Sequence, residues 1–268
     1  VLICRGDERL LAAALAGNRL MWFAATVIDF ACLQDVMAPG FAHASRRSLR
    51  GLMKPAVGHF CFPVGQSLSL QATTLIVGSI LGPAQVAIFA TARTFSRFLL
   101  QPVSIVNVAT WPEFSYALGT NDLSLARKLY RRTRLFSVAV AGAGGTLAFL
   151  VGPMFIETWT RHRLSAGHGL LAALLLAAMV NLAWSPGNVV LVSVNQVVGM
   201  AWRYLVASAV GLALMAVLLR EYGLWQGACA LLVAELAMLA YVPGRARAII
   251  DAGLDLDPRP REPTVGLS

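Results

Sequence analysis

Two arginines inside a long apolar stretch carry the clearest chemical signal in this sequence. Arg93 and Arg97 lie four residues apart, which places them on one face of a helix. A guanidinium group is permanently charged and binds phosphate or carboxylate oxygens through paired hydrogen bonds. A charge at membrane depth costs on the order of 2.5 to 3.5 kcal/mol, so it usually faces a cavity or pairs with an opposite charge. The spacing therefore predicts a phosphate-binding cavity, with ion pairs to Asp29 or Glu235 as the alternative.

Further polar side chains extend this pattern. Gln101 falls on the same predicted helical face as the arginines, and Gln71 lies on a milder polar stripe of the preceding helix. Amide side chains can hydrogen-bond sugar hydroxyls, although polar residues also hold membrane helices together. The amides that could do so are Gln66, Gln71, Asn107 and Asn181. We predict that the substrate cavity is lined by Arg93, Arg97, Gln71, Gln101 and Asn107.

Two acids fall near mid-depth of predicted helices and are candidates for ion coupling. Glu235 lies about 18 Å into the last apolar helix when the rise per residue is counted from Gly223. A buried carboxylate there can take up a proton during transport, because desolvation disfavours its charged form. Asp29 lies near mid-depth of the first apolar helix and is a candidate for the same role. An ion pair or a position reaching toward the membrane edge is the alternative for both.

Signatures of enzymes and metal sites are missing from the sequence. It contains no HExxH, no GxSxG and no glycine-rich phosphate loop. The cysteines have no CxxC spacing, so neither a zinc site nor a disulfide framework is predicted. We predict that the protein is not an enzyme and has no catalytic residue, metal or cofactor.

Composition places the helices in a membrane. The chain has 268 residues, of which 57% are hydrophobic and 13% charged, and its mean hydropathy of +0.68 is unusual for a soluble domain. Although the net charge is +9, the basic residues lie between apolar stretches, so a nucleic-acid partner is not expected.

We predict an all-α fold, a polytopic transmembrane bundle of about seven spans. The predicted spans are 20–36, 55–80, 84–110, 135–156, 169–194, 202–219 and 223–242. Gly82-Pro83 predicts a tight turn, and the Pro186-Gly187 pair predicts a kinked or unwound helix, which would serve either a permeation path or packing. The basic run from 127 to 134 predicts a short amphipathic helix on the membrane surface or a charged loop. Lys and Arg are in excess in the segments on one side of the predicted spans, and by the positive-inside rule this side, which includes the C-terminus, is cytoplasmic.

Four segments give the chain a resemblance to a known family. They are 75–82, 86–93, 112–115 together with Asn121-Asp122, and 223–228. Their order and spacing resemble those of bacterial polysaccharide-unit (O-antigen-unit) flippases, within the multidrug/oligosaccharidyl-lipid/polysaccharide exporter superfamily. The likeness covers about residues 50 to 245 and rests on apolar, glycine-containing motifs. The family often has an acid near the position of Thr73, which this chain lacks.

The resemblance implies a function and a place in a longer chain. The family flips lipid-linked oligosaccharides across the bacterial inner membrane by alternating access, and its substrates are undecaprenyl diphosphate sugars. The resemblance also implies membrane lipids and polysaccharide assembly proteins as partners. Its members have two six-helix bundles, so 1–44 would hold the last helix of a truncated first bundle and a linker. Residues 45–245 would form the second bundle, and 246–268 a disordered cytoplasmic tail. Alternatives are a multidrug or cation exporter of the same superfamily, part of a polytopic glycan-assembly enzyme, or a membrane scaffold.

Overall fold

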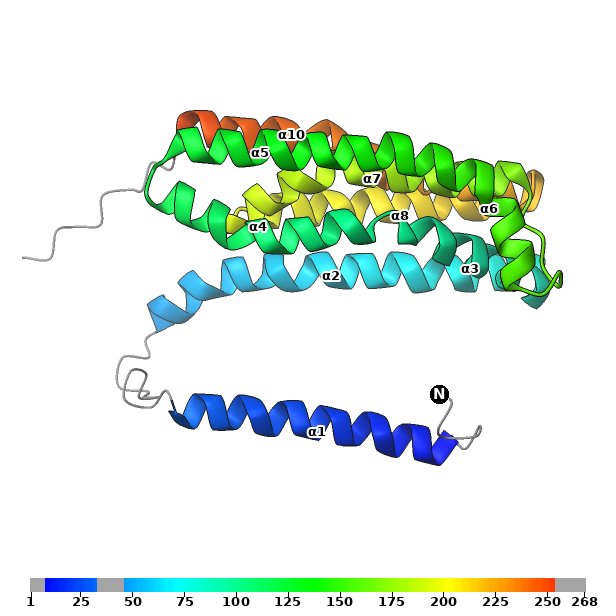
Figure 1. Cartoon of the computed structure of the whole chain (residues 1–268), viewed down its shortest axis with the longest axis horizontal. Helices are drawn as coiled ribbons and strands as arrows, with labels where there is room; N and C mark the ends of the chain where they lie inside the picture. The colour runs from blue at the N-terminus through cyan, green and yellow to red at the C-terminus, as the bar shows by residue number, and fades with distance from the viewer. Residues whose placement is uncertain (1–7, 33–45, 254–268) are drawn as a thin grey trace, which may run out of the picture. The chain divides into compact units, whose positions relative to one another are not determined.

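The computed structural model describes residues 8–32 and 46–253, and these form helices without a strand among them (Figure 1). The chain divides into two compact units, Val1–Arg50 and Gly51–Ser268, which are described separately. The first unit holds α1 (Glu8–Cys32). The end of the span predicted there, residues 33–36, lies outside the described residues.

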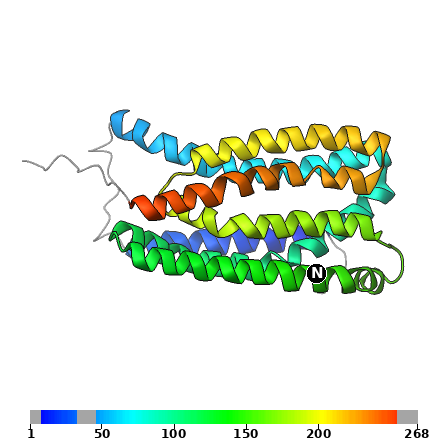
Figure 2. The same cartoon turned by 90° about the horizontal axis from the view of Figure 1, so that it is seen from above.

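Among the described residues, nine further helical segments and one π-helical turn follow α1. They are α2 (Arg46–Leu81), α3 (Pro83–Phe98), α4 (Gln101–Gly119), α5 (Leu123–Ala139), the π-turn (Val140–Gly144), α6 (Gly145–Trp159), α7 (His168–Ser193), α8 (Val198–Glu221), α9 (Leu224–Cys229) and α10 (Leu232–Ala252). In the second unit the long helices lie lengthwise beside one another (Figures 1 and 2).

Five helical stretches among the described residues are long and apolar enough to cross a membrane. They are Ala56–Leu81, Leu123–Trp159, His168–Ser193, Val198–Glu221 and Leu224–Ala252. The predicted all-α membrane bundle is therefore confirmed. The predicted count of seven spans is not, because α1 and the segment 84–110 are not among the five.

The segment 84–110 was expected to be one span, and the structure divides it. Gly82 has a φ of 82° and Pro83 opens α3, so the predicted turn is confirmed. The helix then ends at Phe98, where the backbone N–H groups of Leu99 and Leu100 donate to Ser96 and Arg97 in a tighter turn. Pro102 lacks an N–H that could continue the ladder, and α4 starts anew. The 16 residues of α3 are too few to span a bilayer alone.

The basic run does not form a separate surface helix or a loop. It lies in α5, which continues through the π-turn into α6, so that Leu123–Trp159 is one helical stretch of 37 residues. At about 1.5 Å per residue this stretch is longer than the ~30 Å hydrocarbon layer. Its basic end can therefore extend beyond the layer while its apolar end crosses it.

The predicted interruption at Pro186 leaves the backbone helical. Helix α7 continues to Ser193 with Pro186 inside it, and both Pro186 and Gly187 are buried. A Cβ placed on Gly187 would lie 2.9 Å from Cγ1 of Val242, so the glycine permits close packing of α7 on α10. The structure thus shows no unwound backbone here, and the packing interpretation accounts for this pair.

The last helix also differs from the prediction. Gly223, with a φ of 95°, makes the turn after α8, and the chain then forms the short α9 before α10. The tail was expected to begin at 246, but α10 runs to Ala252, and Ala246, Ile249 and Ile250 are buried. Residues 254–268 of that tail lie outside the described residues.

The two larger of the three hydrophobic cores found among the described residues lie at different levels of the bundle. One contains Phe114, Trp184 and Met238, and the other contains Leu171 and Met215. Along α7 the second core occupies 170–175 and the first occupies 184–191. The region between these levels is where the polar residues gather.

Candidate functional site

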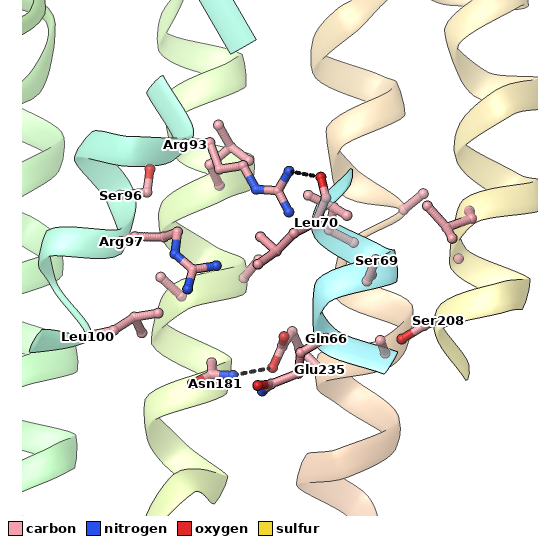
Figure 3. Close-up of a pocket in the computed structure, with 18 of the residues that line it drawn as sticks. Gln66, Ser69, Leu70, Arg93, Ser96, Arg97, Leu100, Asn181, Ser208 and Glu235 are labelled. Carbon is pink, nitrogen blue, oxygen red and sulfur yellow. Dashed lines mark hydrogen bonds between the residues drawn. The ribbon is translucent and has the colours of Figure 1, made fainter. Parts of the chain in front are cut away.

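A cavity of about 170 Å³ lies between the two cores and is lined by α2, α3, α7, α8 and the α9–α10 segment. Several of its lining residues are small, and among them Gly211 lets α8 approach the end of α9 closely: a Cβ there would lie 3.0 Å from the carbonyl oxygen of Ala230, the C-cap of α9. Its polar lining residues are Gln66, Ser69, Arg93, Ser96, Arg97, Asn181, Tyr204, Ser208 and Glu235. Figure 3 shows both guanidinium groups extending from α3 toward α2, with that of Arg93 reaching Leu70.

Arg93 is held by contacts with the helix before it. Its Nη1 donates to the hydroxyl of Thr73 at 2.6 Å and to the carbonyl oxygen of Leu70 at 3.0 Å. The guanidinium carbon also lies 5.6 Å from the ring centroid of Phe89, at cation–π distance. These contacts fix Arg93 as a bridge between α3 and α2 at the edge of the cavity.

Arg97 differs from Arg93 in its contacts. Among the described residues, none forms a hydrogen bond or an ion pair with its guanidinium group. The side chain is exposed and lines the same cavity. Its hydrogen-bond donors therefore remain open to a ligand.

Glu235 faces this cavity from α10. Its Oε2 accepts hydrogen bonds from Nδ2 of Asn181 at 3.0 Å and from Nε1 of Trp184 at 2.9 Å (Figure 3 draws the bond from Asn181). Within the described part of the chain, no ion pair joins Glu235 to Arg93 or Arg97. The side chain of Asp29, the other predicted partner, lies outside the described side chains.

The structure brings some of the predicted site residues together and not others. Arg93, Arg97 and Glu235 line one cavity, whereas Gln71, Gln101 and Asn107 do not. Gln71 lies in a shallow groove of α2, and Gln101 is exposed at the start of α4. The Nδ2 of Asn107 donates to the hydroxyl of Ser185 at 3.3 Å, and its Oδ1 is buried without a partner.

Four polar residues of the cavity are not identified by the sequence analysis. Ser69 precedes Leu70, and Ser96 lies one turn from Arg93. Tyr204 and Ser208 lie four apart on α8 and therefore share a face. That spacing was visible, but an isolated Tyr and Ser in an apolar helix are not a specific signal.

The cavity combines two guanidinium groups with one carboxylate, an excess of positive charge. This arrangement can bind an anionic group, and Arg97 offers it paired N–H donors. No cluster of three or more His, Cys, Asp or Glu that could hold a metal ion occurs among the described residues.

No protein-family model, curated protein sequence or solved structure matches this chain.

Proposed function

We propose that this membrane protein transports an anionic, lipid-linked oligosaccharide, and that its central cavity binds the phosphate groups of that substrate. Two independent lines support the proposal. The first is the resemblance of four sequence segments to polysaccharide-unit flippases. The second is the cavity itself, whose chemistry suits phosphate.

The open guanidinium group of Arg97 is the single observation that carries the proposal. A charge at membrane depth is costly, and a structural arginine compensates this cost through hydrogen bonds to the protein, as Arg93 does, or through an ion pair with a carboxylate. Glu235 lines the same cavity, yet it accepts its hydrogen bonds from Asn181 and Trp184 instead. Arg97 is therefore available for an anionic ligand that enters the cavity.

The size of the cavity limits what it holds in this conformation. Pockets for drug-sized ligands typically measure about 300 to 1,000 Å³, whereas this one measures about 170 Å³. The cavity would accommodate a phosphate-sized group, and the sugars would need a wider opening between the helices. We propose that the wider opening belongs to the other states of an alternating-access cycle.

Localisation follows from the same proposal. We place the chain in the bacterial inner membrane with its C-terminus in the cytoplasm, on the side of the basic segments. The cluster of bases at the start of α5 and the end of α10 supports this orientation.

A second candidate function rests on Glu235. A carboxylate facing the cavity is the group with which a cation exporter would bind its substrate or a coupling proton. The two functions depend on opposite charges in the cavity: a cation exporter needs the carboxylate of Glu235, and a transporter of phosphate-bearing substrates needs the guanidinium group of Arg97. Glu235→Gln would abolish export of a cationic dye by a cation exporter, whereas Arg97→Glu would abolish transport of a phosphate-bearing substrate.

Charge reversal tests the proposal in cells. The gene is deleted from its source organism and replaced by wild type or by the Arg93→Glu/Arg97→Glu variant, and membrane insertion is confirmed by fractionation. Surface glycan is then measured. The proposal expects its loss in the variant, and wild-type levels of glycan in cells with inserted variant would exclude the arginines from transport.

A further inference from the structure

A second hollow, which shares no lining residue with the central cavity, lies between α5 and the last turns of α10. It measures about 420 Å³. Figure 1 shows the two helix ends side by side, and an ion pair of 3.2 Å between Nε of Arg127 and Oδ1 of Asp251 joins them. We call this hollow the α5–α10 groove.

The groove has one charged side and one apolar side. Four arginines line it, together with a single carboxylate, Asp251, which is already paired. These arginines are Arg127, Arg131, Arg134 and Arg247. The apolar side is made by Leu135, Val138 and Ile250. The groove therefore keeps an excess of positive charge directly beside an apolar surface.

The apolar side continues into the membrane-crossing part of the same helical stretch. Leu135 and Val138 are exposed, and further along the stretch Leu147 and Leu150 are exposed as well. One leaflet is about half of the ~30 Å hydrocarbon layer, which corresponds to about ten residues of helix. A molecule with its anionic head at Arg131 and Arg134 could therefore lay a hydrocarbon chain along the exposed apolar residues that follow them in the same helical stretch.

We propose that the α5–α10 groove is a binding site for an anionic phospholipid, with the lipid phosphate among the arginines and an acyl chain on Leu135 and Val138. Arginine suits the head because its planar donors bind phosphate oxygens in pairs. Basic pockets between helices at a membrane surface bind such lipid headgroups. A free phosphate ion would use the arginines but not the apolar side of the groove. The site is distinct from the central cavity and does not depend on the proposed transport function.

The test compares substitutions of two arginines that line the groove with substitutions of two basic residues that do not. Arg131→Gln/Arg134→Gln removes two groove arginines. Lys128→Gln/Arg132→Gln removes the same charge from the same helix at exposed positions that do not line the groove. On α10, Arg247→Gln and Arg245→Gln form an equivalent pair, since Arg245 donates to Gln196 instead.

The full chain is reconstituted in phosphatidylcholine vesicles that contain spin-labelled phosphatidylglycerol or spin-labelled phosphatidylcholine. The immobilised fraction of each lipid is measured by electron paramagnetic resonance, and melting temperatures in phosphatidylcholine confirm that each variant is folded. We expect the wild type to prefer phosphatidylglycerol. The Arg131/Arg134 variant should lose this preference on the order of tenfold and Arg247→Gln several-fold, with both controls close to wild type.

Three results would overturn the proposal. Equal losses in the groove variants and their controls would show a diffuse attraction of charge rather than a site. Displacement of labelled phosphatidylglycerol by inorganic phosphate at equal concentration and ionic strength would show a site for the free ion. A wild type that does not discriminate between the two lipids would show that the groove binds neither headgroup selectively.

Discussion

Nη1 of Arg93 donates a hydrogen bond of 2.6 Å to the hydroxyl of Thr73, and this bond joins α3 to α2 across the Gly82-Pro83 turn. The same hydroxyl donates to the carbonyl oxygens of Ser69 and Leu70 in its own helix. The bond gives one of the two cavity arginines a structural partner, and it leaves Arg97 as the arginine with open donors.

Thr73→Val tests the structural role of that bond. The substitution keeps the shape of the side chain and removes the acceptor of a charged donor, so we expect a loss of about 1.5 to 3 kcal/mol in stability. Thermal unfolding in detergent measures it. Thr74→Val is the matched control, because Thr74 donates only to the carbonyl oxygen of Leu70 in its own helix. Equal effects of the two substitutions would contradict the assignment.

Gly211→Ala tests the close approach of α8 to the end of α9 beside the cavity. The added Cβ would lie 3.0 Å from the carbonyl oxygen of Ala230, a backbone atom that cannot rotate away. We expect a loss of about 1 to 3 kcal/mol from overpacking. Gly244→Ala should instead gain about 0.5 to 1 kcal/mol, because nothing lies within 4 Å of its Cβ and alanine favours helix. Melting temperatures that shift in the same direction would argue against this packing.

The sequence predicted the all-α class of the fold and the turn between α2 and α3, because long apolar stretches and the Gly82-Pro83 pair are local features. It also singled out Arg93, Arg97 and Glu235, which line one cavity. It failed for Gln101, since assigning residues to a helical face requires an unbroken helix. The turn at Leu99 and Leu100 ends the regular period after Arg97, so residues beyond it no longer share the face of the arginines.

The remaining errors have a similar physical cause. The charges of the basic run predict a boundary before the span that follows it, whereas the helix continues through these charges, which extend into water. The predicted position of Gln71 in the cavity rests on the polar stripe of its own helix alone. Which neighbour covers a polar stripe depends on packing between distant segments, and that information is not local.

The cap of α5 predicts a pH dependence of stability. The backbone N–H of Leu125 and then the hydroxyl of Ser124 donate to the Asp122 carboxylate, and they hold its pKa below the ordinary value of 3.8. A depressed folded-state pKa stabilises the fold above the unfolded value, and this contribution is lost as pH falls through the lowered pKa.

Asp122→Ala should therefore lower the melting temperature at neutral pH, and the difference from wild type should shrink as pH falls below 3.8. Asp122→Asn keeps the acceptor without the titration, so the difference in melting temperature between the Asp122→Asn and Asp122→Ala variants should not follow that titration. A difference between wild type and Asp122→Ala that is constant from neutral pH to well below 3.8 would refute the role of the charge.

The bond from Trp184 to Glu235 can be measured by a double-mutant cycle. Trp184→Phe removes the indole N–H and also some packing volume, and Glu235→Leu removes the acceptor. The cycle cancels the packing term, so we expect a coupling free energy of about 0.5 to 3 kcal/mol in thermal unfolding. Strictly additive effects would mean that the bond does not orient the carboxylate.

The most direct test of the account measures transport itself. The full chain is reconstituted in vesicles, and transfer of a fluorescent polyprenyl-diphosphate oligosaccharide between leaflets is followed for wild type, Arg97→Gln, Arg97→Lys and the control Arg220→Gln. Arg220 lies in the last turn of α8 and does not line the cavity. We predict that Arg97→Gln slows transfer on the order of tenfold or more, that Arg97→Lys retains part of the rate, and that the control matches wild type. A wild-type rate in a folded Arg97→Gln protein would contradict the claim that this guanidinium group binds the phosphate of the substrate.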